Sequence, residues 1–162
     1  MRLRVSRKID RPRLGPTCLL VALAILACAG TAGAADKTYT IDTDPVRLGI
    51  KAMEKGDIVE AKARFEEAIA NNHEVHRALF GLAEIALREG RYPDAEAHYR
   101  QSATAGGGKF PVANAGLGLL LLRLGRTQEA AQEFDAALAA DSSLWRAHYG
   151  KARLLLADGE WE

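Results

Sequence analysis

The fold of this chain is decided by a short stretch, Gly56-Asp57-Ile58-Val59-Glu60-Ala61, which is followed by Phe65 and Ala68. Copies of this stretch recur after 34 and then after 35 residues. They are Gly90-Arg91-Tyr92-Pro93-Asp94-Ala95 with Tyr99 and Ser102, and Gly125-Arg126-Thr127-Gln128-Glu129-Ala130 with Phe134 and Ala137. A fourth copy begins at Gly159-Glu160-Trp161-Glu162. A fixed period in this range is typical of stacked helical hairpins, because each hairpin buries its apolar face against its neighbours.

The repeated pattern resembles the tetratricopeptide repeat, whose first helix carries a Leu-Gly pair and whose second helix carries an Ala followed by an aromatic four residues later. The first feature is present as Leu48-Gly49, Leu82-Ala83 and Leu117-Gly118. The second feature is present as Ala61 to Phe65, Ala95 to Tyr99 and Ala130 to Phe134. The resemblance covers about residues 42–162. It implies an all-α fold, a right-handed superhelical solenoid of antiparallel helix pairs with about three and a half repeats.

The chain departs from the family pattern in three ways. His73 and Ser142 stand where a repeat usually ends in Pro, and Pro45, Leu79 and Asn114 stand where the first helix usually has Trp. One additional residue lies in the turn Ala105-Gly106-Gly107-Gly108, which we expect to be a loose joint between the second and third pairs. The predicted organisation is a signal peptide at 1–34, a linker at 35–43 and the solenoid at 44–162, with repeats at about 42–75, 76–109 and 111–144 and a partial repeat at 145–162.

Apolar periodicity and capping residues predict seven helices, at about 45–55, 58–70, 75–89, 92–104, 112–124, 127–140 and 143–157. Asp44 before Pro45 favours the first start, Gly56 the first stop, and the serines before Trp145 are expected to cap the seventh helix. By the repeat phase, Gly49, Ala83 and Gly118 are predicted at helix crossings, with Ala61, Ala95 and Ala130 opposite them. Phe65, Tyr99 and Phe134 are predicted to fill the space between successive pairs, because interiors are close-packed.

The N-terminus is organised like a secretory signal peptide, with a basic stretch up to Arg13, an apolar run at 18–27 and the small residues Ala32-Gly33-Ala34. The apolar run is shorter than the roughly 20 residues of a comfortable membrane span. Cleavage after Ala34 is favoured, and two alternatives stay open. One is an uncleaved anchor, and the other is lipidation at Cys28, which would tether the chain to a membrane. Cleavage after Ala34 would remove both cysteines, Cys18 and Cys28.

The net charge of +1 for the whole chain depends on this basic segment. From Ala35 onward 16 basic and 20 acidic residues give a net charge of −4. An acidic mature chain has no general attraction for nucleic acid, so we predict no nucleic-acid partner.

The sequence contains no arrangement typical of an enzyme. Lys109 after the glycine run is followed by Phe110-Pro111, which excludes a phosphate loop, and there is no dinucleotide motif or strained turn around a nucleophilic Ser. His73 and His76 are three residues apart, but we expect no carboxylate or thiol to complete a metal site with them. We therefore predict no catalytic residue, no cofactor and no metal.

The family resemblance implies instead a concave groove, lined by the first helix of each pair, that holds an extended peptide or a partner helix. The predicted groove residues are Ile50, Met53, Arg77, Phe80, Glu84, Arg88, Leu119, Leu122, Arg123, Arg146, Tyr149 and Arg153, with Val46, Glu54, Leu87, Ala115 and Leu156 beside them. Their charged members are five Arg and two Glu, so a basic groove is expected on an acidic chain. Val46 and Ile50 stand where chaperone-binding members carry carboxylate-binding Lys and Asn, which argues against that subclass.

Two functions remain open from the sequence. The favoured one is an exported, periplasmic scaffold that binds another protein in the bacterial envelope, as in assembly of a pilus, secretion or outer-membrane complex. The alternative is an accessory repeat region of a longer chain, whose catalytic or membrane part lies beyond residue 162. The partial fourth repeat motivates this alternative, and it also predicts that Ala152 and Leu155 face water and that the last helix is prone to self-association.

Overall fold

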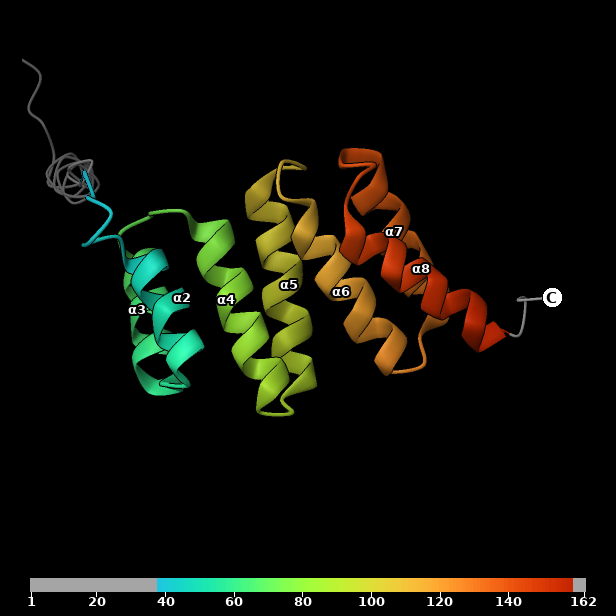
Figure 1. Cartoon of the computed structure of the whole chain (residues 1–162), viewed down its shortest axis with the longest axis horizontal. Coiled ribbons are helices and arrows are strands. Elements are labelled where there is room, and N and C mark those ends of the chain that lie inside the picture. Colours follow the sequence, from blue (N-terminus) through green and yellow to red (C-terminus); the bar gives the residue numbers. More distant parts are fainter. Residues whose placement is uncertain (1–37, 159–162) are drawn as a thin grey trace, which may run out of the picture. The chain divides into compact units, whose positions relative to one another are not determined.

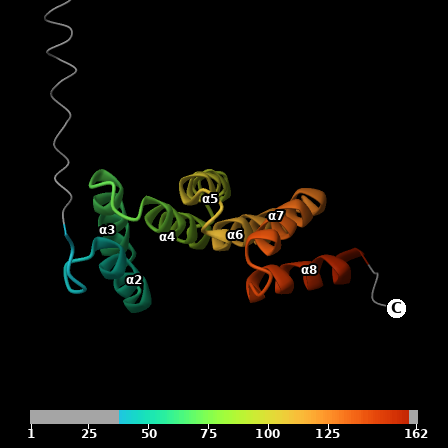
Figure 2. The same cartoon turned by 90° about the horizontal axis from the view of Figure 1, so that it is seen from above.

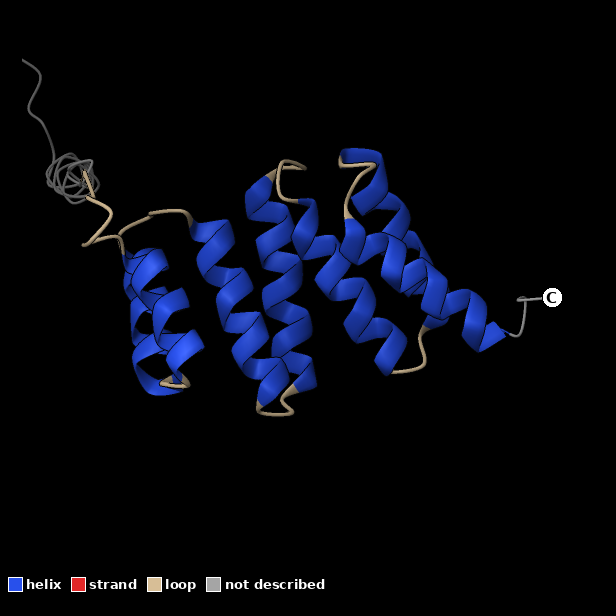
Figure 3. Ribbon diagram, in the orientation of Figure 1, coloured by secondary structure: helices blue, strands red, loops and turns tan. Residues whose placement is uncertain are grey.

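Every regular element among the described residues, 38–158, is an α-helix (Figures 1 and 3). In this computed structural model the helices are α2 (Pro45–Lys55), α3 (Ile58–Ala70), α4 (Val75–Arg88), α5 (Tyr92–Gly106), α6 (Pro111–Arg123), α7 (Thr127–Ala140) and α8 (Trp145–Asp158). No helix in this range is long and apolar enough to cross a membrane. The predicted signal segment with Cys18 and Cys28, and Trp161 near the other end, lie outside the described residues.

The helices form successive antiparallel pairs. The pairs are α2 with α3, α4 with α5 and α6 with α7, and α8 packs against both α6 and α7 as the first helix of a further repeat. Each pair also packs on the next, through α3 with α4 and α5 with α6. Seen from above, α2 and α8 lie toward one side of the array and α5 and α7 toward the other (Figure 2). The described chain is therefore an all-α helical repeat solenoid, as predicted.

Local capping explains most of the helix bounds. The Asp44 carboxylate accepts a hydrogen bond from the backbone N–H of Val46 at 2.9 Å, which satisfies an N–H group that the first turn of α2 leaves without a partner. At the other end Gly56 has φ +80°, the left-handed conformation that stops the helix, and Gly90 and Gly125 repeat it with φ +75° and +77°. The turn glycine of the repeat is thus required by backbone conformation, and α2, α3 and α7 have the predicted bounds.

Two bounds differ from the prediction by two residues, and the end of α4, both ends of α6 and the end of α8 differ by one. Helix α5 continues two residues beyond Thr104, so that of the three glycines only Gly107 and Gly108 lie in the turn, with φ +54° and +79°. Helix α8 begins at Trp145 instead of residue 143, and the serines do not cap it. Asp141 holds this turn instead, because its carboxylate accepts from the backbone N–H of Ser143 at 2.9 Å and from its hydroxyl at 2.7 Å.

The core is built from aromatic rings seated on residues with little or no side chain. Phe65 and Phe134 are fully buried and Tyr99 is 1% exposed. A Cβ placed on Gly49 of α2 would lie 2.7 Å from the Phe65 ring, and one on Gly118 of α6 would lie 2.6 Å from the Phe134 ring. Real Cβ atoms do not approach carbon this closely, so the ring fits only against glycine. The predicted crossings are confirmed, as is the placement of the aromatics between pairs.

A second set of glycines, which the sequence analysis did not identify, completes each seat from the following pair. A Cβ on Gly81 would lie 2.4 Å from Phe65, one on Gly116 would lie 2.7 Å from Tyr99, and one on Gly150 would lie 2.2 Å from Phe134. These three glycines recur after 35 and 34 residues, in step with the repeat. Each aromatic ring is therefore held by two successive hairpins, and this contact joins the repeats into one core.

Candidate functional site

The first helices of successive pairs share a surface that we call the inner face. One hollow of about 730 Å³ lies between α2 and the start of α4 and has Arg47, Lys51 and Glu74 in its lining, and two further hollows are lined by most of the predicted groove residues. The α4 hollow has a volume of about 410 Å³ and is lined by Ile50, Met53, Glu54, Phe65, Arg77, Phe80, Gly81, Glu84, Arg88, Phe110 and Arg146. The α6–α8 hollow has a volume of about 290 Å³ and is lined by Leu87, Leu119, Leu120, Arg123, Tyr149 and Arg153. Helix α4 contributes to both, because Leu87 lines one hollow and Arg88 the other. Eleven of the twelve principal groove residues predicted from the sequence line these two hollows.

Three side chains from different helices are joined by hydrogen bonds at Glu84 in the α4 hollow. The buried Tyr99 hydroxyl of α5 donates to the Glu84 carboxylate of α4 at 2.9 Å, and the Arg146 guanidinium of α8 lies 3.4 Å from the same oxygen. Burial, followed by the neighbouring Glu84 charge, raises the pKa of Tyr99, which keeps the hydroxyl protonated as a donor. Arg146 also lies 5.6 Å from the centre of the Phe80 ring. A residue of the fourth repeat thus reaches back to the second.

Aromatic side chains supply the apolar surface of the α4 hollow. The half-buried Phe80 ring packs edge-on against Tyr99 and against Phe110, with both centroid distances at 5.6 Å. Phe110 comes from the turn between α5 and α6, and its ring also contacts His76 at 4.9 Å. Phe110 was not among the predicted groove residues, although it lines this hollow. Its position after the glycine run and before Pro111 is a signal for a turn, but only the path of that turn brings the ring over α4.

The α6–α8 hollow has a different character, with a leucine floor and an entirely cationic set of charged groups. Leu120 is buried, and Leu119 and Leu87 are partly buried against the core. The Arg123 guanidinium lies 5.4 Å from the ring centre of Tyr92, and the Arg153 guanidinium lies 5.8 Å from that of Tyr149. Stacking of this kind holds a guanidinium over an aromatic face and leaves its N–H donors at the edge available.

Four predicted groove residues line neither hollow, among them Leu156, which is 63% exposed near the end of α8. Val46 and Ala115 are fully buried, so the prediction that they face the groove is wrong. The repeat phase placed them next to groove positions, but each points into the contact between helices. Leu122 lines neither hollow and packs against the core cluster of the second and third pairs.

The predicted excess of arginine divides into two groups. Arg77 pairs with Glu74 at 3.0 Å, and Arg146 pairs with Glu84. Within the described side chains, 38–156, no carboxylate lies in ion-pair range of Arg88, Arg123 or Arg153, and all three are exposed. The unneutralised charge of the inner face therefore lies toward the ends of α4 and α6 and along α8.

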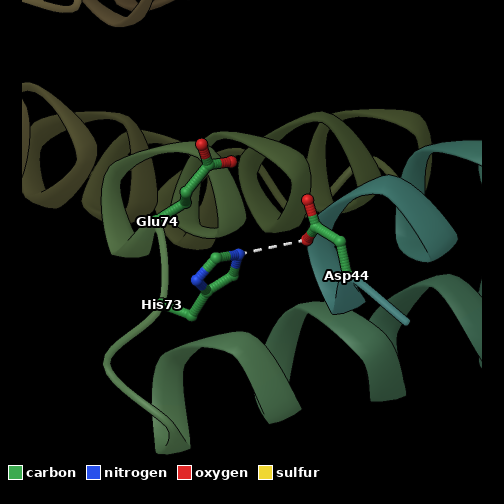
Figure 4. A group of neighbouring side chains, drawn as sticks. All are labelled: Asp44, His73 and Glu74. Carbon is green, nitrogen blue, oxygen red and sulfur yellow. Dashed lines mark hydrogen bonds and ion pairs between the residues drawn. The ribbon is translucent and has the colours of Figure 1, made fainter. Parts of the chain in front are cut away.

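One cluster outside the inner face has metal-ligand residue types. His73, in the turn before α4, places its Nε2 3.2 Å from an Asp44 carboxylate oxygen, and Glu74 follows it (Figure 4). We expected no carboxylate to complete a ligand set with His73 and His76. This is wrong for His73, because the turn brings it back over the start of α2 beside two carboxylates, and His76 is not part of the group. The same Asp44 oxygen caps Val46, and both Glu74 oxygens accept from Arg77, at 3.3 and 3.0 Å. These groups hold the first pair together at the position where the family usually has Pro, and His76 lies against Phe110 instead.

The sequence was compared with models of known protein families and with curated proteins. The tetratricopeptide repeat profile matches residues 46–110 and 113–162, so it includes every helix that borders the inner face. A search of curated proteins found no match.

Proposed function

Since the chain belongs to the tetratricopeptide repeat family, whose members serve as protein-binding scaffolds, we propose that it is an exported, non-enzymatic scaffold that holds a protein segment on its inner face. The observation that carries this proposal is the α4 hollow. Its exposed apolar surface comes from Ile50, Met53, Phe80 and Phe110, and arginines stand at its edges. Aromatic and arginine side chains around an apolar centre are the residue types that dominate binding energy at protein interfaces.

The size of the surface suits an extended segment better than a small molecule. The two hollows lie on first helices of all four repeats and share α4, so one strand of peptide could contact both. Neither hollow encloses its contents, and the lining mixes apolar and charged groups along the whole length. An extended peptide provides alternating side chains and a polar backbone, which match such a lining.

We further propose that binding takes place in the bacterial envelope. The basic, apolar and small-residue order of positions 1–34 supports export to the periplasm, with lipidation at Cys28 as the alternative route to a membrane-tethered form. Assembly of a pilus, secretion or outer-membrane complex is the kind of process that such a scaffold would serve, by analogy with fold and export route.

A pull-down from periplasmic extract tests the proposal. The bait is the chain from Ala35 onward, whose core clusters lie entirely within residues 46–154. We expect a partner that the bait retains and that Phe80→Ala combined with Leu119→Ala, one residue from each hollow, releases. The matched control is Val59→Ala on α3, because Val59 is 83% exposed and outside both hollows. Equal recovery by bait and groove variant, or no recovery at all, would count against the inner face as the binding surface.

A further inference from the structure

We infer that the α6–α8 hollow is a subsite for an acidic side chain of the bound segment, an Asp or Glu next to a large aliphatic residue. This inference rests on the proposed function and specifies the chemistry of the partner. The inference depends on the lining of one hollow, in which Arg123 and Arg153 are the only charged groups among the described side chains and the floor is leucine.

The first argument is charge. Six of the ten described arginines have a carboxylate in ion-pair range, namely Arg64, Arg77, Arg91, Arg100, Arg126 and Arg146. The other four have none among the described side chains, and two of these, Arg123 and Arg153, line the same hollow, although the chain from Ala35 onward is acidic overall. A cationic hollow on an acidic protein favours an acidic partner over a neutral or basic one.

The two arginines are also positioned to bind one carboxylate together. Arg123 is the last residue of α6 and Arg153 lies on the third turn of α8, so the two cations approach the hollow from different helices. Each is stacked on an aromatic ring, Tyr92 or Tyr149, which limits the rotamers that the side chain must lose on binding. Guanidinium groups bind a carboxylate through paired N–H donors, and stacking leaves those in-plane donors free.

The apolar floor of the hollow indicates what lies next to the acidic residue. Leu87, Leu119 and Leu120 come from α4 and α6 and form an apolar base beneath the two cations. A carboxylate alone would leave this base in contact with water. A Leu, Ile or Val next to the acidic residue would cover the base while the acidic carboxylate pairs with arginine, so both parts of the hollow are used.

Selection from a displayed peptide library tests the inference. Random dodecapeptides displayed through their C-termini offer no terminal carboxylate, so any enriched acid is a side chain. Three baits are compared: the chain from Ala35 onward, the same chain with Arg123→Gln and Arg153→Gln, and a control with Arg47→Gln. Arg47 is exposed, has no carboxylate in ion-pair range among the described side chains, and lines the separate hollow between α2 and the start of α4, so its loss removes one cation of the inner face but none of the proposed subsite.

The expected result is enrichment of Asp or Glu beside an aliphatic residue on the unmodified and control baits, and loss of the acidic position on the double variant. A synthetic peptide with blocked ends should then bind about tenfold more weakly to the unmodified chain when its acid is replaced by the amide. The same replacement should have little effect on the double variant. Single Arg123→Gln and Arg153→Gln chains repeat the comparison if the double variant does not fold.

The failures are distinguishable. Enriched peptides without an acidic position, lost on Phe80→Ala, would overturn the acidic subsite and leave the inner face as a peptide-binding surface. An acidic position that persists on Arg123→Gln with Arg153→Gln would also overturn it, since the acid would then bind elsewhere. Absence of any enriched peptide on the unmodified bait would count against both the subsite and the proposed function.

Discussion

At the scale of single residues, the contact that joins the hairpins is an aromatic ring between two small residues of successive repeats. Phe65 lies between Gly49 and Gly81, and Phe134 lies between Gly118 and Gly150. In the second repeat the ring is Tyr99. It packs near Gly116, and the position equivalent to Gly49 and Gly118 is the fully buried Ala83. Close packing of this kind makes the stability of the whole array sensitive to a single added side chain.

Gly118→Leu should therefore be strongly destabilising. Even the first added carbon would lie 2.6 Å from the Phe134 ring, and that ring is already held from the other side by Gly150. Overpacking of a core typically costs about 1–3 kcal/mol, and the lack of room on both sides places this substitution at or above the upper end. Urea unfolding followed by circular dichroism measures the change. Ala136→Leu on the exposed side of α7 is the control, and it should leave the unfolding midpoint nearly unchanged.

The Tyr99 hydroxyl gives a pH-dependent test of the network below Phe80. Its folded-state pKa is raised above the ordinary value near 10, so its contribution to stability is present below pH 10 and is lost as the pH rises. Tyr99→Phe should reduce the free energy of unfolding by about 1–3 kcal/mol at pH 8, because a hydrogen bond to a carboxylate is removed. The difference between the two proteins should shrink between pH 8 and pH 11. If the difference in unfolding free energy between the two proteins did not change with pH, the protonated Tyr99 hydroxyl would not be donating a stabilising hydrogen bond to Glu84.

Residues of the site could be predicted only where the repeat phase specifies them. Phe80, Arg123 and Tyr149 were predicted because groove positions recur with the period. Phe110 could not be predicted in this way, since it lies in the turn with the additional residue. Gly81 and Gly150 were missed for a different reason. They act on the aromatic of the preceding repeat, and a pattern defined within one hairpin does not describe that contact.

At the scale of elements, helix bounds were predictable where a local cap decides them. Asp44 and Gly56 determine both ends of α2 through contacts within three residues or a backbone conformation. The start of α8 was misjudged because Asp141 competes for Ser143, and the sequence shows both as good capping residues. The orientation of Val46 was also misjudged, because one position along a helix changes the direction of a side chain by about 100°.

Helix α8 is less covered by neighbouring helices than the first helices of the other repeats. Leu155 is 49% exposed, whereas its repeat equivalents Leu121, Ala86 and Ala52 are all buried. Lys151 replaces the leucine of the earlier repeats and pairs with Asp135 of α7 at 2.6 Å, which ties one edge of α8 to its neighbour. The exposure of Ala152 and Leu155 predicted from the partial repeat is thus present among the described residues.

Hydrogen exchange should show this difference directly. We expect the amides of residues 154–156 to exchange faster than those of residues 119–122, because α6 is covered on both sides and the α8 face at Leu155 and Leu156 is open to water. The measurement is made on the chain from Ala35 onward, with sedimentation to determine its oligomeric state. Equal protection of the two segments in a monomer would contradict the prediction.

At the scale of the whole molecule, the proposed export would determine which N-terminus the protein carries. We expect the mature protein to begin at Ala35, because Ala32-Gly33-Ala34 is the clearer processing pattern. Intact-mass analysis of the protein purified from its source organism measures this. A mass for a chain beginning at a lipid-modified Cys28 would establish the membrane-tethered form instead, and Cys28→Ser would then release the protein from the membrane fraction. An intact chain of 162 residues in the envelope would contradict both.

The central claim is that the inner face, and not the outer helices, contacts the partner. Site-specific photo-crosslinking in the source organism tests it most directly, with benzoylphenylalanine placed either at Phe80 in the α4 hollow or at Val59 on the exposed side of α3. The prediction is a discrete crosslinked product from position 80 that is absent from position 59 and that weakens when Arg123 and Arg153 are both changed to Gln. A product from position 59 with none from position 80 would contradict the account.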